Sequence, residues 1–566
     1  MAGTWQGLVH QPTFQVSTML LLSDGRVMVQ EEATPHWHAL TPDDKGSYIN
    51  GTWSTLKDMS IWRRYYASGM LKDGRIVVIG GEQSGGGGDT SQGEIYDPVS
   101  DAWSPMPSPP GWTTVGDAAC NILPDGRLMI GALWPSTECA IYDPVTNSWS
   151  AAASKATSSN EETWIQLPDH TIVTTQCWAP YQTEKYIIAT NTWQNEGALP
   201  VAIVDQVMHE MGPGMLMYNG KVIFFGAAND GGKGKTVIYD PPGIPSGTGT
   251  WAAGPDVPKV AGQTMVSNDC PASLLPNGRV LFTSSPFQNN SWGQPVSFFE
   301  YDPASNSISA AATPTNNGNI VYMSRLMLLP SGQVLFGVGG KDIQCYTPHG
   351  GPHDAWRPTI HAIVPLGGGH YRLKGTQLNG LSQANIYGDD CYPATNYPLV
   401  RLKNDATHKV YYCRTYDFST MGVATGGALE SVRFTVPSLP HGSYDVCVVA
   451  NGISSHCVDF PHHHEKHHEH GEKGEERCCQ PCCQPCCQPC CCQACGGGEG
   501  GRDEAEIREL KEEMRRLQNS VHRLASMVQR EDVHEKKEAT KEHKEKRDRD
   551  DDDEREGRRK EKPRSK

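Results

Sequence analysis

The fold is decided by residues 65–80, YYASGMLKDGRIVVIG, and by the stretches that repeat this pattern about every fifty residues. In each repeat a short apolar strand runs into a tight turn and then into a second apolar strand. Asp-Gly and Asn-Gly turns between apolar runs are typical of β-hairpins, because these turns need positive φ. The seven turns are Asp24-Gly25-Arg26, Asp73-Gly74-Arg75, Asp125-Gly126-Arg127, Asp169-His170-Thr171, Asn219-Gly220-Lys221, Asn277-Gly278-Arg279 and Ser331-Gly332-Gln333.

A second landmark follows the turns: Tyr96-Asp97-Pro98 with Trp103, and similar pairs at Tyr142/Trp149 and Tyr239/Trp251. Repeats of this length with four short strands each are typical of propeller blades. The last repeat lacks a fourth strand, whereas residues 3–5 (GTW) resemble residues 51–53 (GTW). We therefore predict that the N-terminal strand completes the seventh blade of a kelch-type β-propeller over residues 1–351.

Beyond the propeller the pattern changes. Residues 352–460 hold short strands with alternating polarity, which predict an immunoglobulin-like β-sandwich and make the folded part all-β. Residues 461–501 are a His/Cys-rich low-complexity segment. Residues 502–531 carry apolar side chains at heptad spacing and predict a C-terminal coiled coil. Residues 532–566 are highly charged, and we expect them to be disordered.

The charge of the chain and the distribution of its cysteines limit which partners and which compartment we expect. Residues 1–460 contain 25 basic and 38 acidic side chains, a net charge of −13, which disfavours nucleic acid as a partner. The first residues have no basic start or apolar stretch of a secretory leader, and no apolar run is long enough to span a membrane. The nine cysteines before residue 461 are scattered, so we expect reduced, buried thiols in a cytoplasmic protein.

The innermost strands of all blades converge on the propeller axis, so one fixed position before each turn selects a ring of side chains. Counting nine residues back from the central turn residue gives Val16, Tyr65, Asp117, Glu161, Met211, Asp269 and Met323. Glu162, Glu210 and Tyr322 stand one step away from this ring. Carboxylates brought together in a channel repel, so they need a cation, a basic ligand or raised pKa values. We predict a ligand site at Asp117, Glu161, Glu210 and Asp269; the alternative is that these acids hold backbone amides of neighbouring blades.

The order of the domains, with Arg63-Arg64-Tyr65 before one turn and Val321-Tyr322-Met323-Ser324 before another, resembles the galactose oxidase and glyoxal oxidase family over residues 1–460. That resemblance implies one copper ion on the propeller axis, held by two Tyr and two His, with one Tyr cross-linked to a Cys. It also implies oxidation of an alcohol or aldehyde, with dioxygen reduced to peroxide. Tyr65 and Tyr322 match the two tyrosines.

Three other positions depart from the family pattern. Val16 stands where the cross-linking Cys belongs, Met323 replaces one His, and Tyr416 is offered where the sandwich normally supplies the other His. Loss of imidazole removes the nitrogen donors that suit Cu(II). We therefore expect a non-catalytic ligand- or protein-binding protein. The alternatives are an oxidase with altered ligands that uses Tyr65, Tyr322 and Tyr416, and a structural scaffold without a small ligand.

The segments after residue 460 add two expectations. Four CxxC pairs offer thiolates for zinc or copper(I), although S-acylation to a membrane or plain repeat expansion would also account for the run. These cysteines are Cys479, Cys482, Cys483, Cys486, Cys487, Cys490, Cys492 and Cys495. The heptad positions of residues 502–531 predict a homo-oligomer with a parallel coil.

Overall fold

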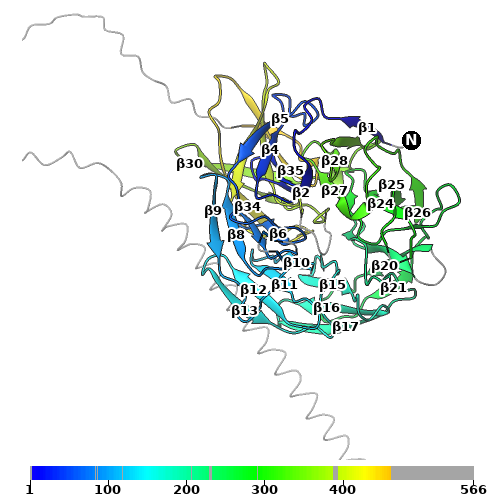
Figure 1. The fold of residues 1–566 in the computed structure, drawn as a ribbon. Coiled ribbons are helices and arrows are strands. Elements are labelled where there is room, and N and C mark those ends of the chain that lie inside the picture. Colours follow the sequence, from blue (N-terminus) through cyan, green and yellow to red (C-terminus); the bar gives the residue numbers. More distant parts are fainter. Residues whose placement is uncertain are drawn as a thin grey trace, which may run out of the picture. The chain divides into compact units, whose positions relative to one another are not determined.

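The computed structural model describes residues 3–460 except 83, 86, 118, 206, 229–232, 290 and 386–392. Seven antiparallel sheets are arranged in a ring around one axis (Figure 1). The seven-bladed propeller predicted from the turns is confirmed. The predicted coiled coil, the His/Cys-rich segment with its candidate metal ligands, and the charged tail lie outside the described residues.

Five blades follow chain order from the inner strand outward. They are β2 (Val16–Leu21), β3 (Val27–Glu31), β4 (Trp37–Thr41) and β5 (Thr52–Leu56); β6 (Ala67–Met70), β7 (Ile76–Ile79), β8 (Gly93–Asp97) and β9 (Ala102–Met106); β10 (Cys120–Ile122), β11 (Leu128–Gly131), β12 (Cys139–Asp143) and β13 (Ser148–Ala152); β14 (Ile165–Gln166), β15 (Thr171–Thr175), β16 (Gln182–Ile187) and β17 (Thr192–Ala198); and β18 (Gly214–Leu216), β19 (Val222–Ala228), β20 (Lys233–Asp240) and β21 (Thr250–Ala253).

The sixth blade has an inner strand in two pieces, both paired with the same neighbour. Its strands are β22 (Met265–Val266), β23 (Ala272–Leu274), β24 (Val280–Pro286), β25 (Ser297–Asp302) and β26 (Ser307–Ala310). The seventh blade consists of β27 (Ser324–Leu328), β28 (Val334–Val338), β29 (Gln344–Thr347) and the N-terminal strand β1 (Thr4–Gly7). The pairing of β1 with β29, Thr4 opposite Thr347, confirms the predicted closure of the ring.

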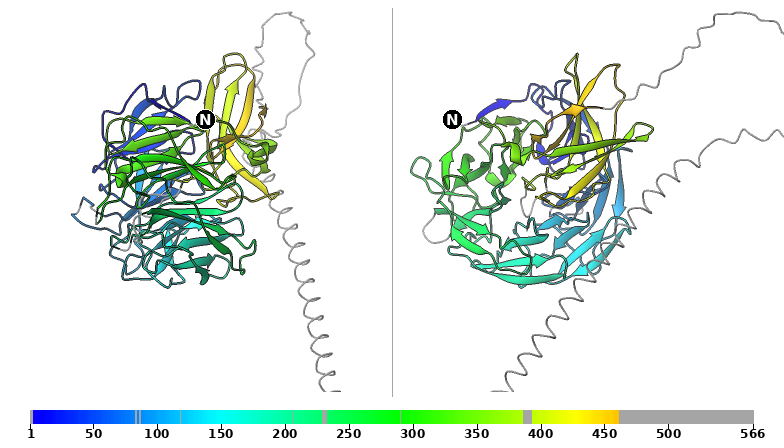
Figure 2. Two further views of the ribbon diagram at one scale, coloured as in Figure 1. Left: turned by 90° about the vertical axis from the view of Figure 1, so that its right-hand side faces the viewer. Right: turned by 180° about the vertical axis from the view of Figure 1, so that it is seen from behind.

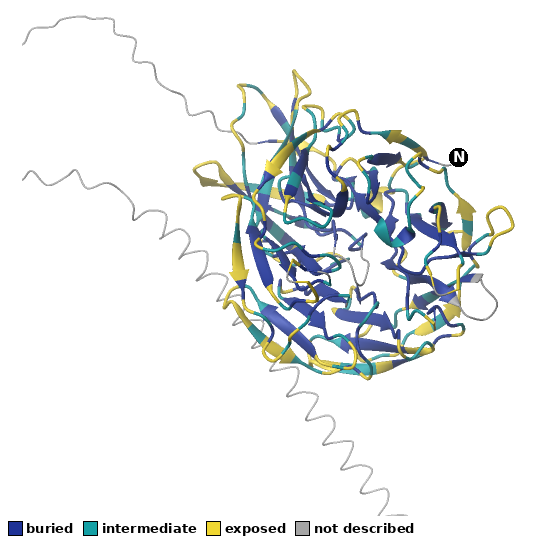
Figure 3. Ribbon diagram, in the orientation of Figure 1, coloured by how far each residue is buried: buried dark blue, intermediate teal, exposed yellow. Residues whose placement is uncertain are grey.

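The Tyr and Trp landmarks join neighbouring blades. Within a blade the two rings pack against each other, as at Tyr142 and Trp149, whose centroids are 5.3 Å apart. The Trp149 indole N–H also donates to the Pro107 carbonyl of the preceding blade at 2.7 Å. Trp5, Trp53, Trp103 and Trp251 donate to the preceding blade in the same way. Each such Trp lies on a more exposed outer strand, whereas the inner strands are buried (Figure 3).

The sandwich follows a short 3₁₀ turn (Asp354–Trp356). Its strands are β30 (Thr359–Gly367), β31 (His370–Thr376), β32 (Leu399–Asn404), β33 (Val410–Tyr416), β34 (Leu429–Thr435), β35 (Tyr444–Ala450), β36 (Ile453–Ser454) and β37 (Val458–Asp459). The end of β33 pairs with β34 and its beginning with β32, so this strand joins the two halves of the sheet. Buried Leu373, Val400, Phe434 and Val448 form the core between them.

The sandwich is bonded to the end of the blades that carries the Asp-Gly turns, here called the turn face. Backbone N–H groups of Thr415, Phe418 and Met421 donate to carbonyls of three propeller turns, Ser23 at 3.0 Å, Lys72 at 3.1 Å and Pro124 at 2.9 Å. Figure 2 shows the sandwich strands, in yellow, on this one side of the ring. The turn face is therefore occupied, and the opposite face belongs to the blade loops.

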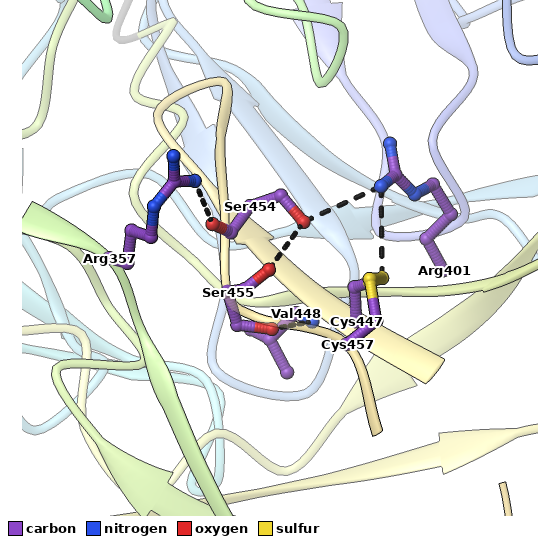
Figure 4. The surroundings of a disulfide bond; sticks show 7 residues. All are labelled: Arg357, Arg401, Cys447, Val448, Ser454, Ser455 and Cys457. Carbon is purple, nitrogen blue, oxygen red and sulfur yellow. Dashed lines mark hydrogen bonds between the residues drawn. A yellow bond between two sulfur atoms is a disulfide. The ribbon is translucent and has the colours of Figure 1, made fainter. Parts of the chain in front are cut away.

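The cysteines depart from the expectation at one place. Cys447 and Cys457 form a disulfide, next to Arg401, whose guanidinium Nη2 is 3.7 Å from Cys447 Sγ (Figure 4). The expectation of a reduced thiol was wrong for these two residues, because the return of the chain after β36 brings Cys457 beside β35. Six other described cysteines are free and buried. Among the described residues no helix is long and apolar enough to cross a membrane.

The disulfide closes a loop of sequence separation 10. Replacing both cysteines, Cys447→Ser with Cys457→Ser, should lower the free energy of unfolding by about 2–3 kcal/mol, because the unfolded chain regains the entropy of the open loop. Thermal unfolding with and without dithiothreitol measures the effect. Reductant should lower the melting temperature of the wild type and leave the double variant unchanged; equal sensitivity of both proteins would contradict the assignment.

The inter-blade bond of Trp149 is also testable. Trp149→Phe keeps an aromatic ring against Tyr142 and removes the donor to Pro107, so we expect a loss of about 1–2 kcal/mol in the free energy of unfolding. Val145→Ala is the matched control, because Val145 lies in the same blade and is 91% exposed. Urea unfolding curves of both variants measure this loss of free energy. If the Trp149→Phe curve superimposes on the Val145→Ala curve, the hydrogen bond adds no stability.

Candidate functional site

The hub of the propeller is built on backbone in the left-handed region. Tyr65, Asp117, Glu161 and Asp269 have φ of 48°, 49°, 60° and 58°, and each precedes the inner strand of its blade. Their amides link neighbouring blades: Asp117 N–H donates to the Tyr65 carbonyl at 3.2 Å, and Glu161 N–H to the Asp117 carbonyl at 3.1 Å. Left-handed backbone costs about 1–2 kcal/mol for a residue with a Cβ. The inter-blade bonds offset that cost.

A cavity of about 340 Å³ lies at these hub residues. We call it the hub cavity, and its lining residues are Arg64, Tyr65, Glu82, Asp117, Glu161, Glu210, Asp269, Trp292, Tyr322 and Met323. Tyr65 stands before β6 and the Asp73-Gly74 turn stands after it, so the cavity and the turn face lie at opposite ends of the inner strands. None of the described residues of the sandwich lines the hub cavity.

One part of the cavity wall is aromatic. The Tyr65 and Tyr322 rings have centroids 6.5 Å apart at an interplanar angle of 77°, and Trp292 meets Tyr322 at 5.1 Å and 71°. Tyr322 comes from a 3₁₀ turn (Val321–Met323) that leads into β27, and Trp292 comes from the loop between β24 and β25. Three ring faces are thus turned in different directions at one site.

The rest of the wall is acidic. Five of the ten lining residues carry a carboxyl group and one, Arg64, is basic. Arg64 also pairs with Glu32, with Nη2 2.6 Å from Oε1, so its charge is shared with an acid outside the cavity lining. Five acids around one arginine give the hub cavity a strong preference for positive charge.

Glu210 is the most constrained of these acids. Its side chain is only 8% exposed, and its Oε2 atom has no hydrogen-bond partner among the described residues. Burial raises the pKa of Glu210 well above its ordinary value, and the negative charge of Asp269 raises it further. A hydrogen bond with Glu161 opposes the rise. Burial and the neighbouring acids therefore favour the protonated form of Glu210.

Six of the seven candidate catalytic or ligand-binding residues line this one cavity: Tyr65, Tyr322, Asp117, Glu161, Glu210 and Asp269. Tyr416 does not. It lies on β33 of the sandwich, where its hydroxyl is 2.9 Å from His370 Nδ1, and its Cβ lies next to the Gly74 turn. Tyr416 was suggested by the family resemblance and not by the offset, and β33 docks on the turn face.

Two neighbours of the ring are structural. Glu162 is fully buried, pairs with Lys155 and accepts from the Trp164 indole N–H at 3.1 Å. His209 has φ of 60° and stacks on Trp178 at 4.1 Å, outside the cavity lining. Sequence reasoning missed Arg64, Glu82 and Trp292. Glu82 and Trp292 come from loops that do not share the repeat, so no periodic position pointed to them.

The sandwich also enters the axis from the turn face, which the sequence did not indicate. The Ala384 carbonyl accepts from Leu274 N–H of β23 at 2.9 Å, and Gln383 Oε1 accepts from Gln166 N–H of β14 at 3.3 Å. Both residues are buried. This segment ties the inner strands of two blades to the sandwich, and the strands themselves separate it from the hub residues.

The alternative role of the hub acids is to hold backbone amides of neighbouring blades. The amides of Asp117, Glu161 and Asp269 bond to backbone carbonyls of neighbouring blades, the last to Met211 at 2.6 Å. These amides consequently do not need carboxylate partners. The acids' side chains line the cavity instead.

The lining residues do not fit the copper centre that the family resemblance implies. Among the ten described lining residues there is no imidazole and no thiol, and Met323 lines the cavity where a His would stand. Cys120 is fully buried, donates to the Ser68 carbonyl, and burial raises the pKa of its thiol to about 12. A thiol so protonated is unreactive. The described residues also contain no group of three or more His, Cys, Asp or Glu side chains placed to hold a metal ion.

Comparison with known proteins agrees with the fold. The kelch motif matches residues 63–110. A galactose oxidase of Gibberella zeae is 39% identical over 57 residues, which span 10% of this chain and 8% of the oxidase. An F-box/kelch-repeat protein of Arabidopsis thaliana is 28% identical over 131 residues, 19% of this chain and 27% of that protein.

Among solved structures, a fungal alcohol oxidase of the AA5 family in complex with copper is 14% identical with a TM-score of 0.49, over 81% of this chain and 99% of that one. The chain spans well under two thirds of the length of the two sequence relatives. The sequence matches confirm the resemblance inferred from the motifs. Residues 63–110 carry a kelch motif, and a short stretch of the chain is similar to galactose oxidase.

The raised pKa of Glu210 predicts a pH-dependent stability. The folded protein keeps this proton to a higher pH than the unfolded chain, whose Glu titrates near 4.5, so stability is full below that pH and is lost as pH rises through the folded pKa. Glu210→Gln cannot ionise. We expect it to be more stable than the wild type at pH 8 by about 1 kcal/mol or more, with little difference at pH 4.

Thermal unfolding at both pH values checks this. Glu138→Gln is the control, because Glu138 is an exposed acid outside the cavity. A Glu210→Gln variant that loses stability at pH 8 would mean that Glu210 is ionised and paired in the native protein.

Proposed function

We propose that this protein is a non-catalytic binding protein whose ligand occupies the hub cavity. The observation that carries the proposal is the composition of the cavity wall, with five carboxyl groups, three aromatic rings and one arginine. Such a wall recognises a polar ligand by charge and by ring contact. The left-handed backbone at four hub residues adds support, because strained backbone concentrates at functional sites.

The second candidate is an oxidase with altered ligands, favoured by the two tyrosines that line the cavity in the positions the resemblance implies. Against this candidate, valine, methionine and acids stand where the family resemblance implies nitrogen and sulfur groups. A phenol without a thioether is harder to oxidise. Tyr416, the third tyrosine of this candidate, lies on the turn face and is not available to the same site.

The segments after residue 460 extend the proposal. A parallel coil over residues 502–531 would gather several hub cavities in one homo-oligomer and raise avidity for a ligand displayed in many copies. The cysteine run would add a zinc or copper(I) site, and it would hold the protein at a membrane only if it were acylated. The proposed compartment is the cytoplasm; against it, the Cys447–Cys457 disulfide is a feature of oxidising compartments.

The two candidates differ in redox chemistry. The full chain is incubated with Cu(II), oxidised with ferricyanide, and assayed by electron paramagnetic resonance and for peroxide with primary alcohols and aldehydes. We expect neither a tyrosyl radical nor peroxide above a free-copper control. Tyr65→Phe and Tyr322→Phe are the matched variants. A radical and peroxide output that both variants abolish would replace the binding proposal with the oxidase.

A further inference from the structure

We infer that the ligand of the hub cavity is a small organic ammonium ion, held with its cationic head between Glu161, Glu210 and the three aromatic rings. This inference rests on the proposed binding function and names the ligand class for it. It is carried by charge, ring geometry, size and one unsatisfied buried atom, each of which is independent of the family resemblance.

The charge of the wall selects a cation. Asp117, Glu161 and Asp269 come from three blades, and Glu210 adds a fourth. Arg64, the one basic lining residue, pairs with Glu32. A neutral polyol brings no charge to this acidic wall, whereas a cation is complementary to it.

The rings select an organic cation. Tyr65, Tyr322 and Trp292 all line the cavity, and the planes of neighbouring rings meet at 77° and 71°, so the rings are not parallel. The negative face of an aromatic ring attracts a cation within about 6 Å of its centroid, and Trp and Tyr are the strongest partners. Ammonium groups with attached methyl or methylene carbons use such walls by both charge and apolar contact. A hydrated divalent ion gains nothing from them.

The volume of the hub cavity also favours an organic cation over a bare metal ion. A volume of about 340 Å³ is at the lower end of the range for small-molecule sites, and it is far larger than the roughly 30 Å³ that one water occupies in the liquid. A bare metal ion would leave most of it to water. An ammonium group with a short carbon chain fills it.

Glu210 provides the group that a ligand would satisfy. Its Oε2 atom is buried without a partner among the described residues, although the residue lines the cavity. The groups that act on Glu210 are Asp269, Glu161, Glu82 and Asp205, all of them acids. An ammonium group in the cavity beside the Glu210 carboxyl group would favour the ionised carboxylate. Binding should therefore release a proton and strengthen as pH rises.

The test is titration calorimetry of the full chain with choline, a quaternary ammonium ion, and with spermidine, which carries primary amines. Galactose and calcium chloride are run as neutral and metal probes. We expect choline or spermidine to bind one molecule per chain, more tightly at pH 8 than at pH 5.5. Glu210→Gln should weaken binding about tenfold or more, and Tyr322→Leu by roughly threefold to thirtyfold.

Controls separate the hub from the rest of the chain. Glu138→Gln should bind like the wild type. Asp117→Asn and Trp292→Leu are a second acid substitution and a second ring substitution, for use if Glu210→Gln or Tyr322→Leu does not fold. No saturable binding of either amine would overturn the inference. Calcium binding weakened by Glu210→Gln but not by Tyr322→Leu, or galactose binding weakened by both, would also overturn the ligand class and would leave the binding function standing. A copper-dependent radical would instead remove the binding function itself.

Discussion

The hub depends on one constraint, the left-handed backbone that lets an amide of one blade reach a carbonyl of the blade before it. At Asp117 and Glu161 this contact is made between equivalent positions of adjacent blades. Blade packing alone, through the Tyr and Trp pairs, fixes the outer strands. The hub bonds fix the inner strands against one another, and they do so at the point where the chain enters each strand.

The same conformation decides where the side chains go. A residue with positive φ just before a strand does not continue the alternation of side chains along that strand. Tyr65, Asp117, Glu161 and Asp269 all obey this, and they line one cavity. With the sandwich bonded to the turn face, the loops that carry Glu82 and Trp292 complete the wall. The cavity wall is therefore formed by residues at repeated blade positions together with residues from loops that are not part of the repeat.

This division explains what the sequence predicts. Repeated turns fix the blade number, the closing strand and the hub positions, because each obeys a local rule that recurs. The offset places Tyr65 and Asp117 correctly to one residue, since the same number of residues separates hub and turn in their blades. It fails for Val16 and Met211, which do not line the cavity. Tyr416, the Cys447–Cys457 bond and the Gln383–Ala384 contact depend on how two domains or distant strands dock, which has no local signature.

Either a proton or a cationic ligand can reduce the repulsion between the negative charges of the hub acids. Glu161 and Glu210 come from adjacent blades and share a hydrogen bond, and burial with Asp269 nearby opposes a second negative charge. Here the protein supplies the negative charge, so a bound partner must be cationic or the carboxyls must stay protonated. The described lining combines acids and aromatic rings without imidazole or thiol, and this composition favours the proposed recognition of a charged organic ligand over electron transfer.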